Sequence, residues 1–237
     1  MTVADTLPLA VRARQRVGRA LPRPVWKAQW SLRYRARWGF TPPPLGTDWS
    51  GYEGLLVTFD RLGIADVPGD VVEVGVLLGG GTYKLCRYFE REAPRKRVFA
   101  IDVFDPSFDV TASAGGPVMA DLYHEVLAGR DQRAVFDEVT RDCRNLVVVA
   151  EDSATARVPS EQLAFGYVDG NHSAPYVRND FDLVWSRLSP GGVVAFHDYG
   201  VDHPPVTHTL HALIGEHADE VEKLWVEEPV IYIQRGA

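Results

Sequence analysis

The chain has 237 residues, long enough for one well-buried α/β domain or two small ones. Its 46% apolar and 24% charged residues are ordinary for a globular protein. No apolar run approaches the roughly 20 residues of a membrane span, and the N-terminus lacks the layout of a secretory signal. The two cysteines, Cys86 and Cys143, are too few for a disulfide framework or a zinc site. These features predict a cytoplasmic protein with no membrane partner; an organellar transit peptide in the Arg-rich N-terminus is the alternative.

The net charge of −7 is unevenly distributed along the chain. Residues 1–45 contain nine Arg and Lys against one acid, so this arm carries +8 and the remaining residues carry −15. Such an arm is either a solvated helical segment beside an acidic body or a surface for an anionic partner. Nucleic acid is the less favoured partner, because no recognised binding motif accompanies the charge.

Four aromatic residues of the arm recur at every fourth position: Trp26, Trp30, Tyr34 and Trp38. This spacing predicts a helix over 25–40 with the rings on one face, which the TPPP sequence at 41–44 then ends. The rings must pack on the core or on a partner chain, or else stack on a ligand. We interpret residues 1–45 as a basic helical arm that closes a substrate pocket or forms a homo-oligomer.

Residues 46–237 form the predicted main domain, in which short apolar runs alternate with helical patterns. The apolar runs predict buried strands at 71–76, 98–104, 145–150, 163–169 and 189–198. Helices are expected between them, over about 50–62, from the glycine cluster to about 91, over about 174–188 and over about 206–218. This alternation predicts a doubly wound parallel sheet covered on both faces.

Two segments depart from the alternation. The last strand-like runs, 221–228 and 230–235, are separated only by Pro229, so they should pair antiparallel. The segment 105–121 is long and rich in small residues, and we interpret it as a loop that acts as a lid.

The stretch 72-VEVGVLLGGGTYKL-85 leads from the first predicted strand into a helix and contains four glycines. Glycine clusters occur where the backbone turns sharply or where a ligand approaches closely. A dinucleotide fingerprint starting at Gly75 would need glycine where Leu77 stands, and no Gly-Lys-Ser/Thr follows for a P-loop. A glycine-rich turn without a ligand is the alternative interpretation.

The glycine stretch and the strand ends that follow it resemble those of class I S-adenosylmethionine-dependent methyltransferases over about residues 50–237. The resemblance implies a mostly parallel seven-stranded sheet with an antiparallel C-terminal strand. It also implies that Glu73, Gly75 and Gly79 hold the amino-acid part of S-adenosylmethionine.

The same resemblance implies a role for residues after the second and third strands. Asp102, in 98-VFAIDVF-104, stands where the family holds the ribose hydroxyls, and a carboxylate can accept both hydroxyl protons. Asp152 and Ser153, in 150-AEDSA-154, stand at the turn that meets the adenine. All these positions fall at the carboxyl ends of the predicted strands, where open α/β sheets bind ligands.

Acidic residues also end the fourth and fifth predicted strands, which lie about 4.8 Å apart if they are neighbours. The pattern is similar to that of metal-dependent O-methyltransferases, including macrocin-type sugar methyltransferases. The similarity implies that Asp169, His197 and Asp198 bind Mg²⁺ or Mn²⁺. His197 replaces an acid of the family, and imidazole is a poor ligand for Mg²⁺. A structural role for the two aspartates is therefore the alternative.

His172 lies three residues beyond Asp169, and the resemblance implies that these two residues are catalytic. In catechol-type relatives a lysine at the position of His172 deprotonates the acceptor hydroxyl. An imidazole with a pKa near 6.5 can act as that general base without strong tuning. The weaker histidine candidates are His203, His208 and His211.

The predicted function is methyl transfer from S-adenosylmethionine to a hydroxyl of a small-molecule acceptor, a sugar or another secondary metabolite. The first alternative is a methyltransferase-fold protein of natural-product biosynthesis that performs a cyclisation or rearrangement. The second, less favoured, is a nucleic-acid-binding methyltransferase that uses the basic arm.

Overall fold

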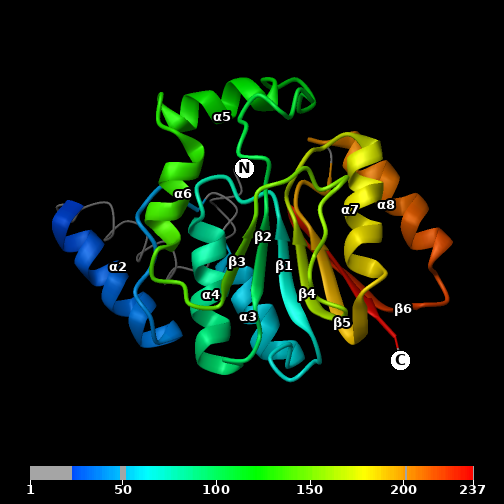
Figure 1. Cartoon of the computed structure of the whole chain (residues 1–237), viewed down its shortest axis with the longest axis horizontal. Coiled ribbons are helices and arrows are strands. Elements are labelled where there is room, and N and C mark those ends of the chain that lie inside the picture. The colour runs from blue at the N-terminus through cyan, green and yellow to red at the C-terminus, as the bar shows by residue number, and fades with distance from the viewer. Residues whose placement is uncertain (1–22, 49–51, 201, 237) are drawn as a thin grey trace, which may run out of the picture. The chain divides into compact units, whose positions relative to one another are not determined.

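The computed structural model describes residues 23–48, 52–200 and 202–236 (Figure 1). The chain divides into two compact units, Met1–Pro42 and Pro43–Ala237. The boundary that we predicted from the charge distribution, between residues 45 and 46, lies three residues further along. Within the described ranges no helix is both long enough and apolar enough to cross a membrane.

The described part of the first unit is built around α2 (Arg23–Trp38). It corresponds to the helix expected from the aromatic spacing, and it ends before the run of prolines. The ring centroids of Trp30 and Tyr34 lie 5.8 Å apart, as expected for residues four apart on one helix face. The Trp26 side chain and the basic residues among 1–22 lie outside the described residues.

The second unit contains a seven-stranded sheet in the order β3-β2-β1-β4-β5-β7-β6. Its strands are β1 (Asp70–Val74), β2 (Val98–Ile101), β3 (Leu146–Val149), β4 (Leu163–Val168), β5 (Leu188–Phe196), β6 (Val221–Glu227) and β7 (Val230–Arg235). The first five strands pair in parallel, whereas β7 pairs antiparallel with both β5 and β6. This order confirms the predicted mostly parallel sheet with an antiparallel C-terminal strand.

Helices cover both faces of the sheet, with α3 and α4 on one face and α7 and α8 on the other (Figure 1). The helices of this unit are α3 (Glu53–Leu62), α4 (Gly80–Glu92), α5 (Met119–Leu127), α6 (Gln132–Thr140), α7 (Ala174–Trp185) and α8 (Pro204–Glu216). We did not predict α5 and α6 from the sequence. The loop that we expected over 105–121 ends earlier, because α5 begins at Met119.

The central strand β1 shows how the sheet positions the site. Val72 and Val74 pack into the core beneath α7, with Phe181. Because side chains alternate along a strand, Glu73 faces the opposite side, where it contacts Tyr52 and α4. The strands β1, β2, β4 and β5 run in the same direction, so their carboxyl ends meet at one edge of the sheet.

Candidate active site

Two adjoining cavities open at the carboxyl edge of the sheet, with volumes of about 590 Å³ and 1070 Å³. The first cavity is lined by the ends of β1, β2 and β4 and by residues between β2 and α5. The second is lined by the glycine turn, α5, and the segment that follows β5. The residues that line both cavities are Gly75, Leu77, Tyr123 and Asp169. Gly75 and Asp169, which follow β1 and β4, therefore lie where the two cavities meet.

Gly75 is the point at which the chain leaves β1. Its φ is +81°, and an added Cβ would lie 2.1 Å from the carbonyl oxygen of Asp169. Only glycine therefore fits between the ends of β1 and β4. Gly79 begins α4 with φ +80°, and an added Cβ there would lie 2.8 Å from the Phe136 ring. Gly75 thus borders the cavities, whereas Gly79 lines neither and allows α4 to pack against α6.

Glu73 is fully buried and lines neither cavity. Its two carboxyl oxygens each accept a hydrogen bond of 2.5 Å, one from the Tyr52 hydroxyl and one from Thr82 Oγ1. Burial raises the pKa of Glu73 to about 8, although both hydrogen bonds oppose the shift. In this structure Glu73 thus contacts Tyr52 and Thr82 and lines neither cavity, whereas the family resemblance implies that it holds the amino-acid part of the cofactor.

Asp102 lies directly after β2 and lines the first cavity, where the sequence placed the ribose site. Its carboxylate accepts hydrogen bonds from the backbone N–H of Val76 (2.9 Å) and Phe104 (2.7 Å). Burial raises the pKa of Asp102, while these N–H groups oppose the rise. Gln132 of α6, which we did not single out from the sequence, lies 3.4 Å from both carboxyl oxygens and also lines the cavity.

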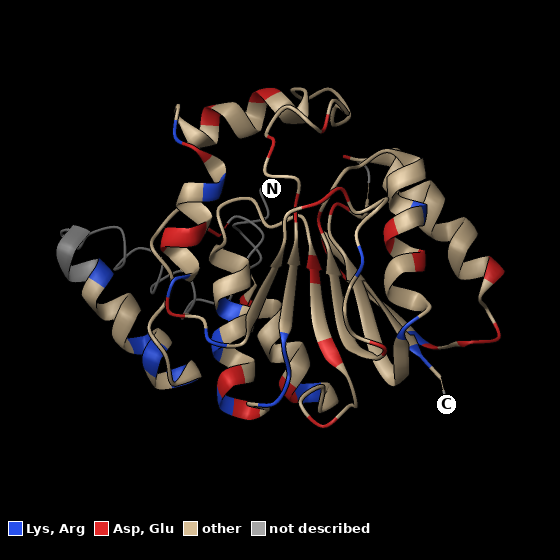
Figure 2. Ribbon diagram, in the orientation of Figure 1, with Lys and Arg blue, Asp and Glu red and all other residues tan. Residues whose placement is uncertain are grey.

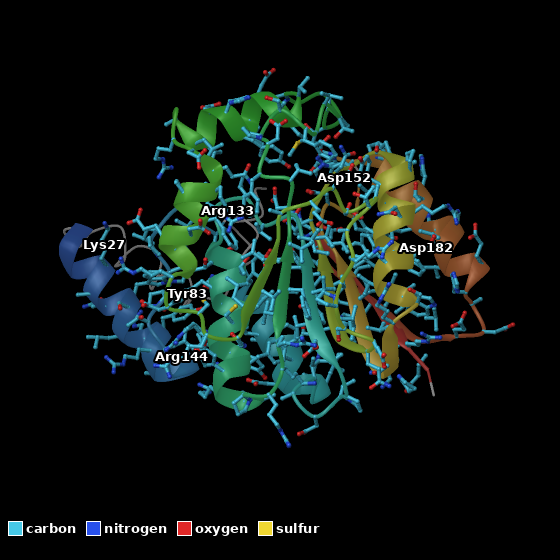
Figure 3. All side chains as sticks on the ribbon, in the orientation of Figure 1. Lys27, Tyr83, Arg133, Arg144, Asp152 and Asp182 are labelled. Atoms are coloured by element: carbon cyan, nitrogen blue, oxygen red, sulfur yellow. The ribbon has the colours of Figure 1, made fainter. Side chains whose placement is uncertain are left out.

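The turn after β3 contains the two residues that we expected near adenine, and they differ in whether they line the first cavity. Ser153 and Glu151 line the first cavity, but Asp152 does not. Asp152 accepts a hydrogen bond of 2.9 Å from the Tyr176 hydroxyl of α7 and one of 2.9 Å from the Ala154 N–H. It lies at the end of the sheet where α7 begins (Figure 3). Asp152 thus holds the turn in place, and Ser153 faces the cavity.

The three predicted metal ligands converge at the second cavity. Nδ1 of His197 lies 3.0 Å from Asp198 Oδ2 and 3.4 Å from Asp169 Oδ1. Burial by itself lowers the pKa of His197, but the two carboxylates outweigh it and raise the pKa to about 11. Asp198 adopts the left-handed conformation with φ +57°, a strained backbone position of the kind found at functional sites.

These residues fit a divalent cation. One ligand atom from each of Asp169, His197 and Asp198 lies within 4.8 Å of the others. His197 Nδ1 is buried and, among the described residues, has no hydrogen bond of normal geometry. Two carboxylates and one imidazole suit Mn²⁺, which accepts nitrogen ligands, better than they suit Mg²⁺. Asp198 also forms a second such group with His172 and His203.

His172 is buried, with 4% of its surface exposed, and both ring nitrogens have carboxylate partners. Nδ1 lies 2.6 Å from Asp109 Oδ2, and Nε2 lies 2.7 Å from Asp198 Oδ2. Burial by itself lowers the pKa of His172, but the two carboxylates outweigh it and raise the pKa to about 9. His172 lines neither cavity, so it reaches an acceptor hydroxyl only if the hydroxyl replaces Asp198 at Nε2.

Sequence reasoning missed Asp109 and Tyr123, both of which lie in the region between β2 and α6. Tyr123 of α5 lines both cavities, and burial together with nearby carboxylates raises its pKa. No local pattern marks either residue, because their contacts are with segments distant in the sequence. Of the weaker histidine candidates, His203 stacks on His172 at 4.2 Å and lines the second cavity. His211 instead bonds Tyr199 at 2.7 Å on the outside of the site.

A family model described as a methyltransferase domain matches residues 72–199, from β1 to the end of the candidate metal site. The chain belongs to this methyltransferase family. The match confirms the predicted enzyme class, an S-adenosylmethionine-dependent methyltransferase, and it includes every cofactor and metal position that we predicted. A search of curated proteins found no match.

Solved structures with low sequence identity share the fold. The O-methyltransferase NovP is 21% identical with a TM-score of 0.60, over 81% of this chain and 86% of that chain. The calicheamicin methyltransferase CalS11 is 19% identical with a TM-score of 0.54, over 78% and 80%. An rRNA methylase from Streptococcus thermophilus is 11% identical with a TM-score of 0.50, over 76% and 95%. These likenesses confirm the class I fold, which serves more than one kind of acceptor.

Proposed function

We propose that the protein transfers the methyl group of S-adenosylmethionine to a hydroxyl of a small-molecule acceptor. The observation that carries the proposal is the junction of the two cavities. Gly75 and Asp169 border both, and the histidines and carboxylates gather beside them. A donor in the first cavity and an acceptor in the second would therefore meet next to groups that can orient a hydroxyl and take its proton.

In this proposal the first cavity holds the adenosine part of the cofactor. Asp102 accepts the ribose hydroxyls, and Ser153 contacts the adenine. The amino-acid part lies along the turn at Gly75. Glu73 and Gly79 keep the turn in shape from beneath, and their contribution to cofactor binding is indirect.

The reacting step needs one proton acceptor, because the sulfonium already activates the methyl group. The acceptor oxygen forms a bond to the methyl carbon, the carbon–sulfur bond breaks, and its electron pair stays on sulfur. Asp169, which borders both cavities, orients the hydroxyl toward the methyl group. When the hydroxyl displaces Asp198, His172 loses one of the two carboxylates that raise its pKa, so the ring gives its Nε2 proton to solvent. The neutral Nε2 then takes the proton of the hydroxyl.

We further propose that Asp169, His197 and Asp198 hold a divalent ion, Mn²⁺ in preference to Mg²⁺. The ion would supply positive charge that favours loss of the acceptor proton. Titration of Mn²⁺ into the protein, followed by electron paramagnetic resonance, tests binding without reference to turnover. An Asp169→Asn variant that binds Mn²⁺ as tightly as the native protein contradicts the ligand assignment, as does full turnover in excess chelator.

For the acceptor we propose a sugar or another secondary metabolite. NovP is described as an O-methyltransferase and CalS11 as a TDP-rhamnose 3′-O-methyltransferase, and both share this fold over most of their length. A non-methylating rearrangement remains the second candidate, because the same cavities could bind a metabolite without transferring a methyl group. Formation of S-adenosylhomocysteine in equal amount to a product heavier by one methylene favours the first candidate.

The direct test is a methyl-transfer assay with S-adenosylmethionine labelled in the methyl group and a panel of hydroxylated sugars and aglycones. We expect label in an acid-stable ether product and none with acceptors whose hydroxyl is already methylated. Isothermal titration with S-adenosylmethionine and S-adenosylhomocysteine provides the control, since neither requires an acceptor. Absence of binding by both cofactors contradicts the proposal.

We propose that the arm, residues 1–45, closes the acceptor cavity or joins copies of the chain, and does not act by binding nucleic acid. The aromatic spacing that motivates this idea is kept in the structure, where Trp30 and Tyr34 share one face of α2. Deleting 1–45 should abolish turnover or change the mass measured by light scattering, while circular dichroism shows a folded remainder. Full turnover with unchanged mass contradicts the proposal, and a salt-sensitive gel shift of RNA or DNA would revive the alternative.

A further inference from the structure

Residues 43–48, which precede α3, border the second cavity beside the glycine turn. Thr47 and Asp48 line this cavity, as does Gly81 in the first turn of α4. Gly75, where the glycine turn leaves β1, lines both cavities. A cofactor with its adenosine part in the first cavity and its amino-acid part along the turn therefore reaches the side of the second cavity that Asp48 borders.

The backbone before Asp48 is held directly against the start of α4. The Gly80 N–H donates to the carbonyl of Thr47 at 3.0 Å, and an added Cβ at Gly80 would lie 2.4 Å from that carbonyl. Only glycine therefore allows the two segments to approach this closely. The Thr47 hydroxyl donates to the carbonyl of Pro44 at 2.7 Å, which fixes the turn that leads to Asp48.

The Asp48 carboxylate belongs to a cluster with Lys84 of α4 and Glu53 of α3. The Lys84 ammonium donates to Asp48 Oδ2 and, at 2.7 Å, to Glu53 Oε1. The side chains of Lys84 and Asp48 are 3% and 8% exposed, so this ion pair is shielded from solvent. The cluster contains two carboxylates and one ammonium group, which gives it a net charge of −1.

The second carboxyl oxygen of Asp48 has no such partner. Asp48 Oδ1 is buried and accepts no hydrogen bond from any residue that the structure describes. A buried charged oxygen without a donor costs free energy, and native proteins rarely leave one in that state. Because Asp48 lines the second cavity, a ligand bound there can supply the donor. The negative charge of the cluster favours a donor that is a cation.

Glu73 cannot supply the same contact in this structure. Its two oxygens accept hydrogen bonds from Tyr52 and Thr82, and it lines neither cavity. Asp48 has a carboxyl oxygen without a donor and borders the second cavity beside the turn. The amino-acid part of S-adenosylmethionine carries an α-ammonium group, which is a cationic donor of the kind that this oxygen requires.

We infer that Asp48 is a cofactor-binding residue whose Oδ1 accepts a hydrogen bond from the α-ammonium group of S-adenosylmethionine. The inference rests on the proposed function, which places the amino-acid part of the cofactor along the turn at Gly75. The ammonium group brings the net charge of the cluster with Lys84 and Glu53 to zero. The hydrogen bond is charge-assisted and lies in a shielded position, so it contributes substantially to cofactor affinity.

The test compares two ligands in Asp48→Asn by isothermal titration. S-adenosylhomocysteine carries the α-ammonium group, whereas 5′-methylthioadenosine has the same adenosine and thioether parts but no amino-acid part. We expect Asp48→Asn to weaken S-adenosylhomocysteine binding by about 10–150-fold and 5′-methylthioadenosine binding by less than about threefold. Asp142→Asn, the same change at an exposed position, should match the native protein with both ligands.

Three results of this comparison would overturn the inference. Equal weakening of both ligands would show general damage to the site. An unchanged Kd for S-adenosylhomocysteine in the folded Asp48→Asn protein would show that the ammonium group lies elsewhere. An unchanged Kd together with a raised acceptor KM would assign Asp48 to the acceptor.

A second variant separates Asp48 from its ion pair with Lys84. Glu53→Gln removes the charge of the other partner of Lys84 and leaves Asp48 in place. Because the Glu53 side chain is 40% exposed, its effect on the S-adenosylhomocysteine Kd should be at least about fivefold smaller than that of Asp48→Asn. Effects of equal size would attribute the loss to Lys84 and overturn the inference.

The native protein provides a test that remains available if Asp48→Asn fails to fold. An analogue of S-adenosylhomocysteine that lacks the α-amino group should bind the native protein about 10–150-fold more weakly than S-adenosylhomocysteine. Equal affinities overturn the inference. A native protein that binds S-adenosylhomocysteine but methylates no acceptor contradicts the proposed function alone, and the comparison at Asp48 still decides the inference. Absence of S-adenosylhomocysteine binding contradicts both.

Discussion

The two ends of the sheet treat charged side chains in opposite ways. At the amino end, Asp70 accepts bonds from Arg97 Nη2 (2.8 Å) and Ser160 (2.8 Å), and Lys96 donates to the carbonyl of Gly69 (2.7 Å) and to that of Val67. At the carboxyl end, acidic residues gather around the loops above the strands (Figure 2). Neither Lys nor Arg lines the two cavities there, within the part of the chain that the structure describes.

This difference between the two ends distinguishes charged residues that stabilise the fold from charged residues that are placed to bind a ligand. Paired charges such as Asp70 and Arg97 contribute modestly to the stability of the folded chain. At the carboxyl end the carboxylates instead contact His172 and His197, and such clusters of titratable groups with shifted pKa values are typical of functional sites. Substitutions at the amino end should therefore change stability alone, and those at the carboxyl end should change activity.

The largest effect is expected at Asp198, which contacts both His172 and His197. Asp198→Asn should lower turnover by about 10²–10⁴-fold, because it removes a carboxylate from the proposed ion site and changes the surroundings of the proton acceptor. The folded variant should also be less stable in urea at neutral pH, because His172 and His197 hold the pKa of Asp198 well below its usual range and this stabilising contact is lost. A variant with native turnover would place the chemistry elsewhere.

Asp102→Ala should weaken S-adenosylhomocysteine binding by about 1–3 kcal/mol, which is about 5–150-fold in Kd. The reason is the loss of hydrogen bonds between a charged group and the ribose hydroxyls. Isothermal titration measures the change, and Asp142→Ala, an exposed acid, is the matched control. An unchanged Kd in the folded Asp102→Ala protein would show that the ribose lies elsewhere.

Asp180 of α7 is a buried carboxyl group that lies apart from the charged residues compared above. Burial raises its pKa to about 6, above the 3.8 of an unfolded chain, and the charge of Asp152 adds to the rise. Stability associated with the protonated form is complete below pH 3.8 and is lost as the pH rises through 6. Asp180→Asn should therefore increase the free energy of unfolding by about 1–3 kcal/mol at pH 8.

Urea denaturation of native protein and Asp180→Asn at pH 4, 6 and 8 measures that difference. Asn179 donates to Asp180 Oδ1 at 2.9 Å, and an amide oxygen can still accept this bond. The increase in the free energy of unfolding should approach zero at pH 4, where the Asp180 carboxyl of the native protein is largely protonated. A gain of equal size at all three values would attribute the effect to packing and not to ionisation.

The smallest effect is expected at the amino end. Asp70→Asn should lower the free energy of unfolding by about 1 kcal/mol, because its ion pair with Arg97 is half-exposed on the arginine side. Turnover and cofactor affinity should stay native, whereas Asp198→Asn should lower turnover. Reduced turnover in a fully folded Asp70→Asn protein would remove the distinction between the two ends.

The sequence alone was sufficient to predict the strands of the sheet, because buried parallel strands are nearly continuous apolar runs. The runs 71–76 and 163–169 are examples. The convergence of Asp169 with His197 followed from the same logic, since parallel neighbours end at one edge. Glu73 shows the limit of a family pattern. Strand alternation turns its side chain toward Tyr52 and Thr82 and away from the cavities.

The contacts made by residues 102–118, between β2 and α5, could not be predicted from the sequence. Asp109 lies 63 positions before His172, and nothing local indicates that its loop folds back over the first cavity. The helices α5 and α6 were missed for a related reason. The position of α6 depends on packing against α4 and Gly79, and α5 packs through Leu127 on a cluster that includes Leu78.

A crystal structure with S-adenosylhomocysteine and soaked Mn²⁺ tests the assignment of the carboxyl edge most directly. We expect the ribose hydroxyls within hydrogen-bond distance of Asp102 and the adenine beside Ser153. An anomalous manganese peak is expected between Asp169, His197 and Asp198. A cofactor bound outside the first cavity, or manganese bound to other residues while these three remain unchanged, would contradict the account.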